Sequence, residues 1–242
     1  MKAARLYEHG GLRIEEVPKP VPGPGDMLVQ VEVALTDGTE LRRSRSTGAP
    51  APYGTEFCGY LDGRRVVAAD SLTGACADWV LVPADTAATN LLDVPIALPS
   101  DVAALVEPLA RCLGRVGATG IAAGETVAVL GGGALGLLLA ACVSDAGGRA
   151  VVVAGRPAYR ELAAGFGAEI GDGRGADAVI EAGEVEQGSS LVTPASVRAA
   201  LGFLASGAYP WERLITHRVL LADLPALLAE PPDDLLRVAV IP

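Results

Sequence analysis

The sequence predicts an α/β plus β protein, in which a small, mostly β domain precedes a unit built around a parallel sheet. Three observations predict this class. Apolar and polar residues alternate with a period of two through residues 1–35, as in half-buried strands. The continuous apolar run Thr126–Leu130 is followed at once by glycines and a helical pattern, as in a buried strand that turns into a helix. The change between the two patterns falls near residue 100.

The mostly β domain is predicted from short alternating segments bounded by turn residues. Strands are expected at residues 3–7, 12–17, 27–34, 65–69 and 77–82. The segment Pro18–Gly25 is expected to be a stiff connector, because each proline lacks the N–H group that a central strand needs. Residues 37–63 are rich in glycine, proline and serine and are expected to be irregular.

The α/β unit is predicted from strand patterns that alternate with helical ones. Strands are expected at residues 126–130, 150–154 and 178–181, and helices at residues 103–116, 134–146, 157–166 and 194–206. Thr193 caps the last of these, with Pro194 in its first turn. The polar residues 184–190 are expected to form a loop. A short helix at residues 223–230 and a strand at residues 235–241 end the pattern.

Charge and composition exclude some classes of partner. The net charge is −10 and no basic stripe is present, which argues against nucleic acid, because phosphate contacts need clustered Lys and Arg. The cluster Arg42, Arg43 and Arg45 is interpreted as a solvated loop, with contact to a phosphate-bearing ligand as the less favoured alternative. The apolar stretch near Leu135–Val143 is too short to cross a bilayer, and no signal region is found. We therefore expect a cytoplasmic protein.

Cysteine and histidine are scarce, which limits disulfide and metal sites. The cysteines are Cys58, Cys76, Cys112 and Cys142, and none forms a C-x-x-C pair. They are interpreted as small buried hydrophobic residues. The histidines are His9 and His217 alone.

The motif with the clearest chemistry is the glycine turn Gly131–Gly136, which has the spacing G-x-G-x-x-G. It follows a buried strand and opens a helix, as the dinucleotide-binding fingerprint requires. Gly131 permits the tight turn, Gly133 lets the backbone approach a pyrophosphate, and Gly136 lets helix and strand pack closely. Ala134 and Leu135 begin the helix, whose free N–H groups favour an anion. The alternative is a tight turn without a ligand, and we favour a nucleotide site.

The end of the second strand bears on which nucleotide would bind. An acid usually stands there and holds the ribose hydroxyls of NAD, but Gly155 occupies its place and Arg156 follows. A missing carboxylate and an added guanidinium suit the 2′-phosphate of NADP. In the equally weighted alternative, Arg156 is an ordinary solvated residue. Arg160, one turn further on, is compatible with both interpretations.

Taken in order, these segments resemble the medium-chain dehydrogenase/reductase superfamily of the zinc alcohol dehydrogenase type. The resembling segments are Met1–Leu6, Glu15–Pro24, Val29–Ala34, Gly54–Gly59, Val106–Leu113, Gly131–Gly136, Leu214–Val219 and Leu236–Pro242. The resemblance implies a GroES-like β domain at residues 1–117, a shortened Rossmann-type domain at 118–206, and a C-terminal return to the first domain at 207–242.

The family's catalytic zinc ligands are missing from the matching positions. Asp37 stands where the first Cys belongs, Thr55 where the His belongs, and Arg111 where the last Cys belongs, whereas Glu56 keeps the family's Glu. Because a zinc ion needs three good ligands and Arg111 is a permanent cation, no catalytic zinc is expected. The lobe of the structural zinc is replaced by the short stretch Val66–Trp79, so no structural zinc is expected either.

The resemblance also implies that the nucleotide domain is shortened. The chain passes from Ala182 and Gly183 almost directly to the late helix, so the second half of the family's sheet is expected to be missing. That half forms much of the nicotinamide pocket, so binding of the adenosine phosphate end can survive without hydride transfer. Bare strand edges and helix faces associate, which predicts a homo-oligomer or a local fold that covers the gap.

The candidate catalytic residues are those at the family's metal pocket. They are Asp37, Thr55, Glu56, Glu107 and Arg111. Carboxylates near one Arg can do acid–base work, or the Arg can clamp a substrate's carboxylate or phosphate. In the slightly favoured alternative, Glu56–Arg111 or Asp37–Arg111 is a salt bridge that replaces the metal as a structural element.

Three functions stay open at the level of sequence. The first is a zinc-independent, NADPH-dependent reductase of a small carbonyl or alkene substrate. The second is a non-redox lyase, isomerase or cyclase that uses the former metal pocket. The third is a non-catalytic partner protein.

Overall fold

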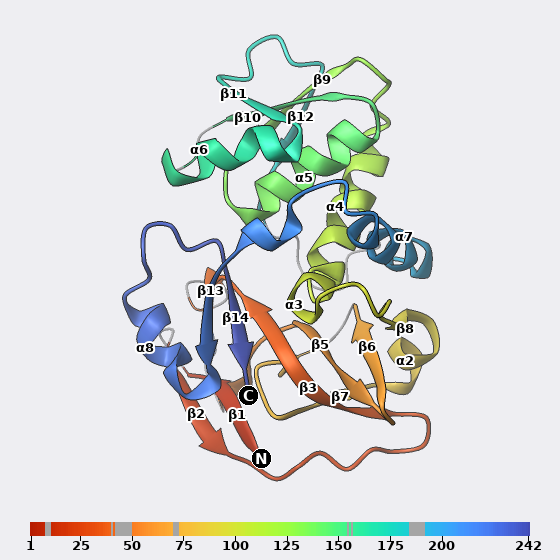
Figure 1. Cartoon of the computed structure of the whole chain (residues 1–242), viewed down its shortest axis with the longest axis vertical. Helices are drawn as coiled ribbons and strands as arrows, with labels where there is room; N and C mark the ends of the chain where they lie inside the picture. The colour runs from red at the N-terminus through yellow and green to blue at the C-terminus, as the bar shows by residue number, and fades with distance from the viewer. Residues whose placement is uncertain are drawn as a thin grey trace. The chain divides into compact units, whose positions relative to one another are not determined.

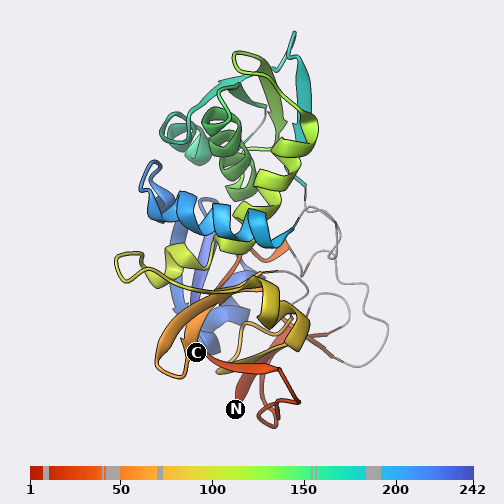
Figure 2. The ribbon, with the colours of Figure 1, turned by 90° about the vertical axis from the view of Figure 1, so that its right-hand side faces the viewer.

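The computed structural model describes residues 1–7, 11–39, 41, 50–69, 73–153, 155, 157–183 and 192–242. Their contacts form two compact units: unit 1 is Met1–Glu107 with Ile215–Pro242, and unit 2 is Pro108–Leu214. Both views place the chain termini near each other in unit 1 (Figures 1 and 2). The three-part division at residues 117 and 206 stays a prediction of domain limits. No helix in the described ranges is long and apolar enough to cross a membrane.

Unit 1 is built on two sheets. The small sheet has the order β2-β1-β4, from β1 (Lys2–Leu6), β2 (Leu12–Glu16) and β4 (Ala51–Pro52). The large sheet has the order β13-β14-β3-β5-β6-β8, with β7 paired to β3. Its strands are β3 (Met27–Thr36), β5 (Glu56–Leu61), β6 (Arg64–Ala68), β7 (Trp79–Val82), β8 (Leu91–Asp93), β13 (Ile215–Leu220) and β14 (Arg237–Ile241). The short helices are α2 (Ala84–Asn90), α3 (Ser100–Ala103), η4 (Leu221–Asp223) and α8 (Leu224–Ala229).

The predicted strands of unit 1 are confirmed as β1, β2, β3, β6 and β7, to within two residues at each end. The expectation that residues 37–63 are irregular is wrong, because they contain β5. Most of β5 is buried on both faces, so its sequence shows no alternation. Gly59 is a residue type that suggests a loop, yet the pairing of β5 with β3 requires a glycine at this position. A Cβ atom there would overlap the carbonyl oxygen of Gln30 on β3.

Unit 2 is built on one parallel sheet with the order β11-β10-β9-β12. Its strands are β9 (Thr126–Leu130), β10 (Arg149–Val153), β11 (Ala168–Gly171) and β12 (Ala178–Glu181). Its helices are α5 (Ala134–Asp145), α6 (Pro157–Ala163), η2 (Ala164–Phe166), α7 (Pro194–Ala205), η3 (Trp211–Leu214) and nearly all of α4 (Val106–Thr119). Helices α5 and α6 lie on one face of the sheet (Figure 1).

The strand order identifies the kind of sheet. Numbered along the chain, the order is 3-2-1-4, which matches the first four positions of the doubly wound order 3-2-1-4-5-6. The sequence predicted three of these strands and missed β11, one of the two edge strands. Only Ala168 of β11 is buried, so the strand carries no apolar run. The sheet therefore keeps the first half of the doubly wound pattern and the first strand of the second half.

The other face of this sheet has no crossover helix between β11 and β12. Residues 172–177 alone connect these parallel strands, whereas such connections usually need about a dozen residues or more. The connection lies on the sheet face, since a Cβ atom at Gly173 would be 2.8 Å from the Ala128 Cβ atom and 2.8 Å from a Val153 methyl carbon. Leu130 and Val179 stay 41% and 61% exposed.

Candidate functional sites

The glycine turn lies where β9 ends, at the point where the sheet order reverses. Strand β9 pairs with β10 on one side and β12 on the other, and ligands of open α/β sheets bind at such a position. Gly131 has a φ of 118°, and its N–H group donates to the carbonyl oxygen of Val153 at 3.0 Å. A Cβ atom at Gly136 would overlap the Gly131 carbonyl oxygen, so both residues must be glycine for the turn and helix to pack.

Gly133 differs from these two glycines, because its surroundings are open. A Cβ atom at Gly133 would meet nothing within 4 Å, and its φ of −77° suits any residue. Gly133 is the N-cap of α5, and no side chain there bonds to the first N–H groups of the helix. Ala134 and Gly136 are buried and Leu135 is half-buried. Packing and backbone conformation do not require glycine at 133, although glycine is a better N-cap than an apolar residue. An anion held against the start of α5 would need that space.

The second strand of the sheet leads to the predicted specificity residues. Gly155 is half-buried, and a Cβ atom there would lie 3.2 Å from the Gly132 Cα atom, so a side chain would crowd the glycine turn. Arg156 lies outside the described residues. Arg160 is exposed on α6.

Arg115 of α4 was not singled out from the sequence, yet it holds the far side of the switch point. Its guanidinium donates to the carbonyl oxygen of Gly183 at 2.7 Å and to that of Glu181. The N–H group of Ala182 donates to the Leu130 carbonyl oxygen at 2.8 Å. These bonds fix the end of β12 beside the end of β9.

The residues at the former metal positions of unit 1 form a buried ion cluster. Arg237 is 3% exposed, and its Nη1 atom lies 2.9 Å from Oε1 of Glu56 and 3.8 Å from Oδ2 of Asp37. The strand pairing explains the meeting, since β3 pairs with both β14 and β5. Asp37 follows β3, Glu56 begins β5 and Arg237 begins β14. Asp37 also accepts hydrogen bonds from the N–H and hydroxyl groups of Thr39, at 2.9 and 2.6 Å.

This cluster adds a cation that the sequence interpretation did not name. Within unit 1, Arg237 lies beside Asp37 and Glu56, and the predicted pairing of either acid with Arg111 stays a prediction. The sequence did carry a signal, since Arg237 is the one charged residue in the otherwise apolar run Leu235–Ile241. Arg111 lies on α4 and belongs to unit 2.

The other predicted catalytic residues stand as follows. Thr55 is half-buried just before β5, and Glu107 is 5% exposed in the first turn of α4. Of the five predicted catalytic residues, Asp37 and Glu56 lie beside the same cation of unit 1, Arg237.

A zinc ion does not fit the residues at these positions. A catalytic zinc needs three nitrogen, sulfur or carboxylate ligands and an open position. Here a guanidinium already lies beside the two carboxylates, and no group of three or more His, Cys, Asp and Glu in the described ranges could hold a metal ion. Thr55 adds only a weak ligand.

Known proteins resemble this chain in fold along its whole length. A protein of Sinorhizobium meliloti 1021 described as a zinc-binding dehydrogenase, solved bound to NADP, matches with a TM-score of 0.82 and 25% identity, over 100% of this chain and 99% of that one. The 2R,3R-butanediol dehydrogenase of Bacillus subtilis matches with a TM-score of 0.79 and 20% identity, over 100% and 99%.

Sequence comparison gives the same family over a shorter stretch. L-threonine 3-dehydrogenase of Stenotrophomonas maltophilia is 28% identical over 206 residues, which cover 65% of this chain and 58% of that protein. The chain thus spans less than two thirds of the length of the curated relatives it matches. The alignment is 206 positions long but includes only 65% of the 242 residues of this chain. The relative therefore has residues within this stretch that this chain lacks. No protein-family model matches the sequence. The GroES-like sheets of unit 1, the Rossmann-type sheet of unit 2 and these relatives together show that the chain resembles the medium-chain dehydrogenase/reductase superfamily in fold and in sequence.

Proposed function

We propose that this protein is a zinc-independent reductase-like member of this superfamily that binds NADPH through the glycine turn Gly131–Gly136. The substrate class proposed for it is a small carbonyl or alkene compound. The relative of Sinorhizobium meliloti was solved bound to NADP, which supports a nicotinamide cofactor here.

The observation that carries the proposal is the contrast between Gly133 and its neighbours. Gly131 and Gly136 are explained by the fold, since side chains there would strain the turn or overlap backbone. Gly133 faces open space and has an ordinary backbone conformation, so packing does not require a glycine. A pyrophosphate that approaches the backbone would require one.

The residues that would hold the cofactor follow from this position. The free N–H groups at the start of α5, at Ala134 and Leu135, would bind the pyrophosphate. Arg156 and Arg160 are proposed to bind a 2′-phosphate, and Gly155 leaves no carboxylate to repel it. NADPH, when bound, supplies a hydride. The protein's part is to orient the cofactor and exclude water from it.

Zinc independence is supported by the ion cluster of unit 1. Arg237 compensates the charge of Asp37 and Glu56, as a metal ion would otherwise do. A carbonyl substrate would then be polarised by hydrogen-bond donors or a cation, without a Lewis acid from this donor set. The proposed groups are the hydroxyl of Thr55 and the guanidinium of Arg111.

Calorimetric titration with NADPH and NADH tests the cofactor. We expect NADPH to bind more tightly, and the Gly133→Val variant to lose at least tenfold in affinity. Its melting temperature should fall by no more than a few degrees, because valine is a poorer N-cap than glycine. Gly202→Ala is the matched control, because Gly202 on α7 also has no atom within 4 Å of a built Cβ atom. Failure of both nucleotides to bind, or equal binding by the Gly133→Val variant, would remove the glycine turn as a cofactor site.

A second candidate function is a non-redox lyase, isomerase or cyclase. It is favoured by two buried carboxylates, Glu56 at 6% and Glu107 at 5% exposure, because buried acids are frequent in acid–base sites. Loss of activity in Glu56→Gln or Arg111→Met without any need for NADPH would support this candidate. Retained function in both variants would favour a non-catalytic partner protein.

A further inference from the structure

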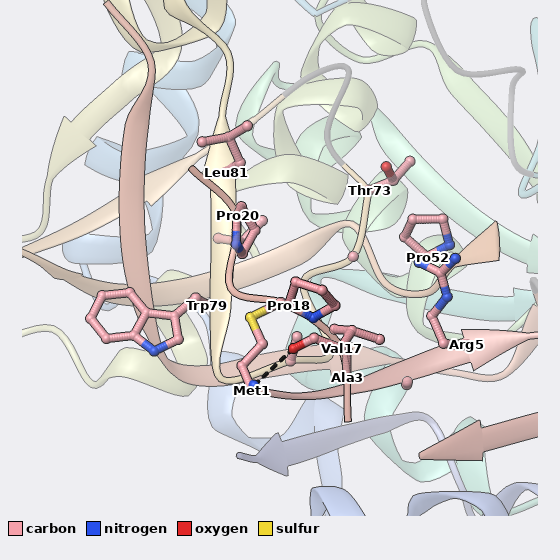
Figure 3. Close-up of a pocket in the computed structure, with 14 residues that line it drawn as sticks. Met1, Ala3, Arg5, Val17, Pro18, Pro20, Pro52, Thr73, Trp79 and Leu81 are labelled. Carbon is pink, nitrogen blue, oxygen red and sulfur yellow. Dashed lines mark hydrogen bonds between the residues drawn. The ribbon is translucent and has the colours of Figure 1, made fainter. Parts of the chain in front are cut away.

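A cavity in unit 1 lies apart from the ion cluster and has no role in the proposed reductase chemistry. Its volume is about 510 Å³, within the usual range of about 300–1,000 Å³ for small-molecule sites. Figure 3 shows that Arg5 and Pro52 stand at one end and Trp79 at the other, with Met1 and Pro18 between them.

The hollow arises where two small residues face each other. Ala3 of β1 bridges to Ala77 in antiparallel fashion, and these two methyl groups leave the space above them unfilled. Alternate residues of a strand point to the same side, so Met1 and Arg5 flank Ala3 on that side, and Trp79 flanks Ala77. The Cα atoms of Met1 and Arg5 are about 13 Å apart by the rise of a strand, which gives the cavity its length.

The walls of the cavity are apolar and rigid. They include Val17, Pro18, Pro20, Pro52 and Leu81. Proline side chains lose no rotamer freedom when a ligand binds, so these walls lower the entropic cost of binding. The indole of Trp79 is held by Lys19, whose Nζ atom lies 3.1 Å from the ring centroid.

The charges in the wall are positive. Besides the α-ammonium group of Met1, which donates to the Val17 carbonyl oxygen at 2.9 Å, Arg5 is the only charged group among the lining residues. Its Nη2 atom donates to the carbonyl oxygen of Pro50 at 2.5 Å, which fixes the plane of the guanidinium. No described carboxylate forms an ion pair with it. In a chain of net charge −10, this apolar cavity therefore carries a local positive end.

We propose that this cavity binds a small organic carboxylate with an aromatic or branched apolar body. The carboxylate accepts hydrogen bonds from the guanidinium of Arg5, whose planar donors match it. The apolar body packs against Pro18, Pro20 and the indole of Trp79. This site lies within unit 1 and does not depend on the proposed cofactor.

The indole N–H signals of the full chain in a ¹⁵N-correlated NMR spectrum test the proposal, with 4-phenylbutyrate as the probe. The chain has two tryptophans, and Trp211 lies buried in unit 2, so only the Trp79 signal should move. The Trp79→Phe variant assigns it. We expect saturable binding of 4-phenylbutyrate and at least tenfold weaker binding of the neutral 4-phenylbutyramide. Equal binding of acid and amide would overturn the role of Arg5, and an unmoved Trp79 signal at millimolar probe would overturn the site.

Variants separate the guanidinium from general charge. Arg5→Gln should weaken 4-phenylbutyrate at least tenfold, and Arg5→Lys should fall between, because an ammonium keeps the charge but lacks the planar fork. Lys2→Gln is the matched control, since Lys2 lies on the opposite side of β1 and loses the same charge. It should leave the affinity within twofold. If Arg5→Gln binds as tightly as the unmodified chain, the proposal is wrong. The comparison of acid with amide on the unmodified chain stands even if Arg5→Gln does not fold.

Discussion

The side chain of Arg237 is the most deeply buried charged group described in unit 1. It is 3% exposed, and it lies beside two acids, Glu56 and Asp37, that are largely withdrawn from water. The sequence located both acids and proposed Arg111 as their cation, which stays a prediction. It did not find Arg237, because the resemblance supplied positions in the metal site and not a partner from another strand. Only the pairing of β14 with β3 brings residue 237 to this place. Register of that kind is set by tertiary packing and cannot be derived from local patterns.

Replacement of Arg237 tests this role. Arg237→Met should lower the free energy of unfolding by about 3–5 kcal/mol, because it removes a buried cation whose Nη1 atom lies 2.9 Å from the Glu56 carboxylate. Arg64→Met is the control, since Arg64 pairs with Asp93 at the surface and both side chains are more than half exposed. Its loss should stay below about 1 kcal/mol. Urea denaturation measures both. Equal midpoints for Arg237→Met and the unmodified chain would show that the cluster adds nothing to stability.

The buried thiol of Cys58 should make the stability of the protein depend on pH in the alkaline range. Burial raises the pKa of its thiol from 9.0 to about 11. Between these values the unfolded chain loses the thiol proton and the folded chain keeps it, so rising pH favours unfolding. The contribution is complete below pH 9 and lost by about pH 11. It is worth on the order of 2–3 kcal/mol. The urea midpoint should therefore fall from pH 8 to pH 10.5, and this fall should be smaller in Cys58→Ala than in the unmodified chain. The same drop in both would contradict this assignment.

The strand–turn–helix element of β9 and α5 was predicted in place from the sequence, whereas β5 and β11 were not. The difference is physical, because the glycine turn depends on local features alone. These are the backbone conformation of Gly131 and the close approach of Gly136 to the Gly131 carbonyl oxygen. Strand β5 is buried by partners distant in sequence, and β11 is an exposed edge. Patterns in a single sequence reveal structure that is determined locally. They miss strands whose position depends on neighbouring strands distant in the sequence.

Two substitutions separate the structural glycines of the chain from the permissive ones. Gly136→Ala should destabilise the protein by about 1–3 kcal/mol or more, because its Cβ atom would overlap the Gly131 carbonyl oxygen. Gly117→Ala on α4 should be neutral or stabilise by about 0.5–1 kcal/mol, since its Cβ atom would meet nothing within 4 Å and alanine favours a helix. Thermal unfolding followed by circular dichroism measures both. A stable Gly136→Ala variant would contradict the packing described for the turn.

For the whole molecule, the main consequence of the shortened sheet is a face without its helix. The connection at residues 172–177 covers Ala128 and Val153 but leaves Leu130 and Val179 exposed. Val179 is register-paired with Ala128, so it lies on the same sheet face as Leu130, two residues further along β9. The homo-oligomer expected from the sequence stays a prediction, and this face is where we expect it to form.

The edge of β12 is a poorer candidate than the face. Antiparallel pairing of two copies about Val179 would set Asp177 opposite Glu181, and opposed like charges in a sheet are destabilising. Association through the face avoids that repulsion and covers both exposed apolar side chains.

Light scattering after gel filtration should therefore show a dimer or larger species that Val179→Lys converts to a monomer. Ile96→Lys is the control, because Ile96 is 99% exposed in unit 1 and its change should leave the oligomer intact. A monomeric unmodified chain at about 100 µM would exclude the homo-oligomer, and an intact Val179→Lys oligomer would exclude this face.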